Sequence, residues 1–227
     1  MKPLGTQPIL IDQVYERLVE AIADGSLEPG ERIRQEEVAA MLGVSRQPVS
    51  HALQLLKRQG LLEETGRRGL TVAGIDAGRI RNLYQVRTAL DALAARLAAE
   101  RVAAGAVPAA QRDALHRILD RGSALGANDP VSAYVRADVE FHTAIYRLSG
   151  NTAIEETVSA QWLHLQRSMG MVLVDPGQRP LVWEEHAVIV RLVAAGDPAG
   201  AEAAARAHTD RAANETAQRL AETTVAA

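Results

Sequence analysis

The sequence contains no cysteine among its 227 residues. Disulfides, thiolate metal sites, iron–sulfur clusters and a cysteine nucleophile are therefore excluded, and any metal site must use histidine and carboxylate side chains. There is also no run of about 18 apolar residues that could cross a membrane, and the first seven residues lack the apolar block of a signal peptide. We therefore expect a soluble, cytoplasmic protein with no membrane partner.

Aromatic residues are scarce, at 3% of the chain, with a single phenylalanine, although 47% of the residues are hydrophobic. Alanine and leucine supply much of that hydrophobic fraction, which favours packed helices over a β-sandwich, where aromatic and β-branched residues dominate. The length exceeds that of one small domain and allows two cores. The composition therefore predicts a mainly α protein.

Positive charge is concentrated in one stretch. The whole chain has a net charge of -3, yet residues 32–68 contain seven basic and four acidic residues and the rest is acidic. Nucleic acid, if bound, would meet one focused basic surface. An ordinary solvated charged surface is the alternative.

The N-terminal third has the pattern of a winged helix–turn–helix. Helical spacing over 9–24 ends at Gly25, a short helix is expected over 35–42, and a third helix follows Ser45, with Pro48 in its first turn. Two strand-like pieces, 61–65 and 69–72, flank a basic hairpin tip. We place this DNA-binding domain at residues 1–74.

The remainder, residues 75–227, is rich in alanine with scattered arginine and glutamate. A glycine-containing break at 74–78 marks the domain boundary, and five later breaks divide this part into six helical segments. A six-helix bundle is the expected assembly.

In a helix–turn–helix, the first residues of the second helix meet base edges in the major groove. Arg46 can bond guanine in bidentate fashion, Gln47 can read adenine or contact phosphate, and Ser45 caps the helix where backbone N–H groups face phosphate. Each residue alone also fits an ordinary surface position. The further DNA-contact candidates are Arg34 and Ser50, with Arg67, Arg68 and Gly69 at the wing tip, where glycine allows close approach.

This N-terminal stretch resembles the DNA-binding domain of GntR-family bacterial transcription regulators. The resemblance is carried by the run Leu42-Gly43-Val44-Ser45-Arg46-Gln47-Pro48-Val49, with Pro29-Gly30 before it and Gly60-Leu61 and Arg68-Gly69 after it. The family usually has Arg-Glu where this chain has Ser50-His51. The departure implies a different operator, or a larger share of the readout for Arg46 and the wing.

Six histidines are present, and two settings suggest a metal site. Asp138 and His142 are four residues apart in one predicted helix, so both side chains lie on one face and can hold one ion. His186 and His208 lie in later helices. The residues alone leave open whether these are ligands or ordinary histidines.

The second part resembles the FCD domain of the FadR subfamily, in its six-helix, VanR-like form, over residues 76–222. The matching motifs are Asp138-Val139-Glu140-Phe141-His142, Ser149-Gly150-Asn151, Glu185-His186 and His208. In metal-binding members, the matching aspartate and three histidines hold a divalent ion. The resemblance thus implies a site at Asp138, His142, His186 and His208 for zinc first, or for nickel or another divalent cation, with coordination positions left for water or a carboxylate.

A matching arginine in the family points into the cavity, which implies that Arg87 pairs with an effector carboxylate. The alternative is a surface pair between Arg87 and Asp91, four residues on. Trp162, Gln166 and Arg167 are expected to line the same cavity.

Together these features predict a transcription regulator, expected to be a repressor, that binds double-stranded operator DNA as a homodimer and responds to a small organic acid. The competing hypothesis is a metal-dependent hydrolase or lyase with an accessory DNA-binding head. The chain lacks the HExxH and ExxH metal motifs, which argues against an enzyme. A nucleoid-structuring protein would need a strongly basic chain.

Overall fold

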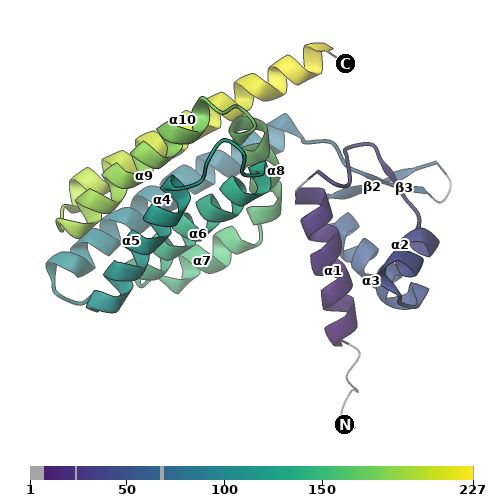
Figure 1. The fold of residues 1–227 in the computed structure, drawn as a ribbon, viewed down its shortest axis with the longest axis horizontal. Coiled ribbons are helices and arrows are strands. Elements are labelled where there is room, and N and C mark those ends of the chain that lie inside the picture. The colour runs from purple at the N-terminus through teal and green to yellow at the C-terminus, as the bar shows by residue number, and fades with distance from the viewer. Residues whose placement is uncertain (1–7, 24, 67–68, 227) are drawn as a thin grey trace, which may run out of the picture. The chain divides into compact units, whose positions relative to one another are not determined.

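The computed structural model describes residues 8–23, 25–66 and 69–226, and the chain divides into two compact units, Met1–Ile75 and Asp76–Ala227. Figure 1 shows a mainly helical chain with one small antiparallel sheet, which confirms the predicted fold class. None of the helices in the described ranges is long and apolar enough to cross a membrane.

The first unit is a winged helix–turn–helix. Gly43 ends the second helix with φ +66°, a left-handed conformation that glycine adopts without strain, and so sets the turn into the third helix. The third helix buries Val49, Leu53 and Leu56 completely. The elements are α1 (Pro8–Ala23), β1 (Arg32–Ile33), α2 (Gln35–Leu42), α3 (Arg46–Arg58), β2 (Leu62–Thr65) and β3 (Gly69–Val72).

The wing is a three-stranded antiparallel sheet in the order β1-β3-β2. Leu62 pairs with Val72 and Thr65 pairs with Gly69, so the turn of the hairpin falls between 65 and 69. Leu62 and Val72 are buried, and β2 packs against α3.

The second unit is a helical bundle in which the described residues form seven helices. The expected segment over 151–175 is divided at Ala160–Gln161, which accounts for one helix more than the six expected segments. The helices are α4 (Ala77–Ala103), α5 (Ala109–Ser123), α6 (Val131–Ser149), α7 (Thr152–Ser159), α8 (Trp162–Leu173), α9 (Gln178–Ala194) and α10 (Pro198–Ala226).

The long helices α4 and α10 lie side by side in the bundle (Figure 1). Small side chains are completely buried on both helices, among them Ala92, Ala95 and Ala99 of α4 and Ala201 of α10. Small residues let helix backbones approach closely, which explains why so few aromatic residues suffice for this core.

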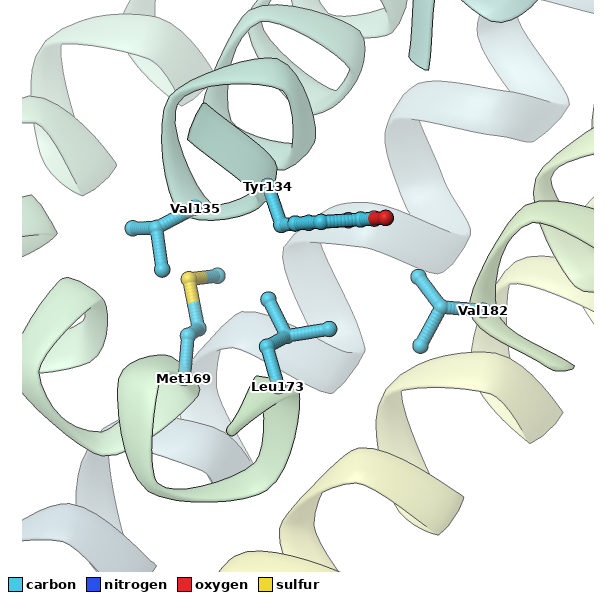
Figure 2. Close-up of a cluster of buried hydrophobic side chains, with 5 residues drawn as sticks. All are labelled: Tyr134, Val135, Met169, Leu173 and Val182. Atoms are coloured by element: carbon cyan, nitrogen blue, oxygen red, sulfur yellow. The ribbon is translucent and has the colours of Figure 1, made fainter. Parts of the chain in front are cut away.

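Figure 2 shows an apolar cluster formed by α6, α8 and α9. Trp162, at the start of α8, packs against this cluster and is partly buried. The guanidinium of Arg179 lies over the ring of Tyr134 at 4.4 Å, and the Tyr134 hydroxyl donates to the carbonyl of Gly126 at 2.9 Å. The cluster consists of Tyr134, Val135, Met169, Leu173 and Val182.

Candidate metal centre and DNA-binding surface

Four predicted ligands from three helices converge inside the second unit. Asp138 and His142 lie one turn apart on α6, His186 lies on α9 and His208 lies on α10. One ligand atom from each lies within 4.8 Å of all the others, and all four residues are buried. The Nε2 atom of His186 is 3.5 Å from Oδ1 of Asp138 and 3.2 Å from Nε2 of His208.

The protonation of this set suits a cation. Burial lowers the pKa of His142 and of His186 well below the ordinary value, so both rings are neutral and offer a lone pair. Burial also raises the pKa of Asp138, against the opposing effect of Arg87. Among the described residues, Nε2 of His142 has no hydrogen-bond partner, although it is buried and lies 3.7 Å from Asp138. Neutral imidazoles with an unsatisfied nitrogen beside a carboxylate fit a divalent cation such as zinc.

His208 has a carboxylate behind it. Its Nδ1–H donates to Glu185 at 2.7 Å, which turns Nε2 toward His186. Glu185 is in turn held by Arg211, and hydrogen bonds from His208 and Arg211 lower the pKa of Glu185, although burial alone would raise it. A carboxylate on the far nitrogen fixes the orientation of a metal-ligating histidine.

Aromatic side chains enclose the histidines. The ring of Phe141 stacks on His186 with centroids 3.8 Å apart, and Trp183 meets His186 edge to face at 4.8 Å. His142 and His208 stack at 5.3 Å. This packing holds the imidazole planes with little rotational freedom.

Arg87 lies beside the four residues and is buried, with 3% of its side chain exposed. Its Nη2 is 4.0 Å from Asp138, and its Nε is 3.2 Å from Oδ2 of Asp91 without the direction of a hydrogen bond. Burial is the largest single effect on the pKa of Arg87 and lowers it, but the interactions with Asp91, Tyr146, Tyr84 and Asp138 together outweigh burial and the pKa is raised. The Arg87–Asp91 pair considered from the sequence therefore exists, in the interior rather than on the surface.

The other predicted cavity residues lie on α8. The guanidinium of Arg87 lies over the ring of Trp162 at 5.2 Å. Gln166 follows Trp162 by one turn and is half-buried, whereas Arg167 is buried. Trp162 is thus in contact with Arg87.

Sequence reasoning missed part of the surroundings of this site. The buried hydroxyls of Tyr146 and Thr209 were not singled out, and Asp91 and Glu185 were considered only in other roles. The available signal was spacing, because Tyr146 follows His142 by four residues and Thr209 follows His208 directly.

On the DNA-binding side, the predicted residues lie at the start of the two helix–turn–helix elements. Arg46 and Gln47 open α3 and are exposed, whereas Ser50 is half-buried. Arg46 forms an ion pair with Glu36 at 3.1 Å, and Arg34 forms one with Glu37 at 2.8 Å. Ser45 occupies the N-cap position of α3, but its side chain makes no capping hydrogen bond, contrary to the expectation.

The wing tip differs from the expectation in one respect. Gly69 is buried and paired in β3, and a side chain there would meet the carbonyl oxygen of Thr65 at 2.6 Å. Glycine is therefore required by the hairpin itself rather than by an approaching DNA backbone. Arg67 and Arg68 lie outside the described residues.

Comparison with known proteins bears on both units. Residues 10–72 match the model of bacterial regulatory proteins of the gntR family, and residues 82–211 match the FCD domain model. The chain belongs to the GntR family of transcription regulators. A helix–turn–helix regulator from an unstable DNA locus of Streptomyces ambofaciens is 31% identical over 201 residues, covering 86% of this chain and 80% of that protein.

Two other similar proteins agree with the assignment. The Escherichia coli repressor RspR is 34% identical over 97 residues, which are 43% of this chain and 42% of RspR. A GntR regulator structure from Rhodococcus sp. RHA1 has a TM-score of 0.75 at 25% identity and covers 93% of this chain and 97% of its own. This GntR regulator is thus a transcription factor, and the hydrolase or lyase hypothesis is set aside.

Proposed function

We propose that this GntR regulator is a repressor of the FadR subfamily whose DNA binding is controlled by a small organic acid at a metal site in the FCD domain. The observation that carries the proposal is the convergence of Asp138, His142, His186 and His208 within 4.8 Å, next to the buried cation of Arg87. A DNA-binding regulator acts in the cytoplasm, on the nucleoid when it is bound to an operator.

The DNA end of the proposal depends on the exposed start of α3. Arg46 would read guanine and Gln47 would read adenine or contact phosphate, with Arg34, Ser45 and Ser50 beside them. One such module reads only a few base pairs, so a homodimer on a near-palindromic operator supplies the affinity that regulation needs. Arg67 and Arg68 would place the wing against the backbone or the minor groove.

The effector end depends on charge. Asp138, His142, His186 and His208 would hold zinc, or nickel as a second choice, and a bound divalent cation would supply positive charge for an acid oxygen. Arg87 would supply a second, fixed anchor for the carboxylate, with the ring of Trp162 alongside. Gln166, one turn further along α8, would line the same cavity. An organic anion is the ligand class that matches these two cationic anchors.

Helix α4 joins the DNA-binding domain to the effector site along the chain. Arg87 lies on this helix, which begins at Ala77, directly after the break that follows β3. An acid that binds Arg87 more tightly in one arrangement of α4 would shift the population toward that arrangement, and operator affinity would change reciprocally.

The effector end is tested by thermal shift of the full chain against a panel of small carboxylic acids, metal-replete and after chelation. We expect one acid to raise the Tm only with metal present, by the increment that RT ln(1 + [L]/Kd) predicts. The effect should be lost in His186→Ala and kept in His116→Ala, which removes an exposed histidine of α5. An acid that acts equally after chelation would contradict the metal-anchored site.

The DNA end is tested on a fragment selected by the wild-type protein from a random library. Arg46→Ala should weaken binding of that fragment by about 1–3 kcal/mol and relax the preference at one base pair. Arg117→Ala, which removes an exposed arginine of α5, is the matched control. Equal losses in the two variants would refute the role of Arg46.

A further inference from the structure

Asp91, on α4, is a buried carboxylate whose hydrogen-bond partners come from two other helices. The hydroxyl of Tyr146 on α6 donates to its Oδ1, and the hydroxyl of Thr209 on α10 donates to its Oδ2 at 2.8 Å. Tyr146 lies one turn after His142, and Thr209 follows His208. Asp91 is therefore hydrogen-bonded to residues that lie close in sequence to His142 and His208, but it is not itself one of the four convergent residues.

Asp91 also faces His142 directly. Its Oδ2 is 3.5 Å from Nδ1 of His142. The Nε2 atom, on the other side of the same ring, lies 3.7 Å from Asp138 and has no hydrogen-bond partner among the described residues. At 3.5 Å the contact is electrostatic rather than a hydrogen bond. A neutral imidazole has one N–H, and a carboxylate beside Nδ1 favours the tautomer with the proton there. The lone pair on Nε2 is then free for an ion.

The opposite side of the set is built in the same way. Glu185 accepts from Nδ1 of His208 at 2.7 Å and leaves Nε2 of that ring facing inward. Two histidines on different helices thus each have a carboxylate at Nδ1, supplied by a third and a fourth helix. An ion pair between Asp91 and Arg87 would not by itself require an imidazole beside the carboxylate. The repeated arrangement therefore indicates that Asp91 acts on His142 and not only on Arg87.

We propose that Asp91 is a positioning residue of the metal site, which holds His142 in the Nδ1–H tautomer and aims its Nε2 at the ion. The inference rests on the proposed function, because it requires that the four residues bind a metal. It gives Asp91 a role in metal binding in addition to its ion pair with Arg87. It also predicts that the negative charge of Asp91, and not only its shape, matters for metal binding.

The test is zinc affinity of the full chain, measured by competition with a chromogenic chelator. Asp91→Asn has nearly the same shape and removes the charge, and we expect zinc to bind about 10–100-fold more weakly. Tyr146→Phe is the matched control, because it deletes the hydrogen bond to Oδ1 but keeps the carboxylate beside His142. Tyr146→Phe should weaken zinc binding by less than about 10-fold.

A second measurement uses only the wild-type protein and so does not depend on how the variant folds. The imidazole ¹⁵N signals of the zinc-loaded protein should show His142 protonated at Nδ1. A proton on Nε2, or an Asp91→Asn variant that loses no more zinc affinity than Tyr146→Phe, would overturn the role of Asp91 alone. If the wild-type protein binds no zinc or nickel, the proposed metal site fails, and the inference fails with it.

Discussion

The contact between Gly122 and Trp183 allows a sharp test of how the bundle is packed. Gly122 lies in the last turn of α5 and is buried against the indole of Trp183 on α9. A Cβ atom at residue 122 would lie 1.9 Å from Cη2 of the indole. Because carbon atoms pack at about 3.5–4.0 Å, the ring would have to retreat by more than 1.5 Å or so.

We therefore expect Gly122→Ala to destabilise the protein. Overpacking of this kind costs about 1–3 kcal/mol, and the helix propensity of alanine offsets at most about 1 kcal/mol. For a net loss of about 1–2 kcal/mol, the Tm should fall by about 2–8 °C, at about 2–4 °C per kcal/mol for a chain of this size. Tryptophan emission should shift to the red, because Trp183 is one of only two tryptophans and is 6% exposed.

Gly170→Ala is the matched control. Gly170 lies within α8, and a Cβ atom there would meet nothing within 4 Å. The same substitution should therefore stabilise the protein by about 0.4–1 kcal/mol. The reasoning fails if both variants shift the Tm in the same direction, or if Gly122→Ala leaves the emission of Trp183 unchanged.

Two further predictions concern the turn and the buried histidines. Gly43→Ala should lower the free energy of unfolding by about 1–2 kcal/mol through backbone strain alone, because φ is +66° and the space around the Cβ position is open. Gly74→Ala, at a position without a positive φ, should not lower it. Urea unfolding of both variants measures the difference. Without metal, stability should fall as the pH drops below about 6.5, since unfolded His142 and His186 take up protons that their lowered pKa values prevent in the folded state. The raised pKa of Asp138 acts in the opposite direction, but one group contributes at most about 1.4 kcal/mol per pH unit against two histidines. A urea midpoint of the chelated protein that rises between about pH 6.5 and 5 would therefore contradict the assignment.

The features that sequence could predict were those with a local chemical cause. Glycine stops, the Pro48 helix start and the alternation of the hairpin depend on neighbouring residues, and they placed α2, α3 and the β2–β3 hairpin correctly, whereas the short strand β1 was not predicted. The interruption at Ala160–Gln161 has no proline or glycine to mark it, which explains why two helices were predicted as one segment.

The candidate site shows the same limit. The four-residue spacing of Asp138 and His142 was visible in one helix, but the approach of His186 and His208 was implied only by family resemblance. The hydrogen-bond partners of Asp91 are hydroxyls 55 and 118 residues away along the chain. No local pattern specifies such contacts, because tertiary packing alone determines which side chains meet in the interior.

The ion pairs of the helix–turn–helix have a consequence for how this regulator would search a genome. Arg46 and Arg34 already have carboxylate partners, Glu36 and Glu37, in the protein without DNA. An arginine that exchanges a carboxylate for a phosphate does not gain a wholly new partner, and a glutamate left beside the DNA backbone is repelled by it. Random sequence, where Arg46 would meet phosphate more often than a correctly placed guanine, would therefore be bound weakly. A guanine edge at the operator would offer Arg46 the proposed bidentate contact, so residence time would be concentrated at operators.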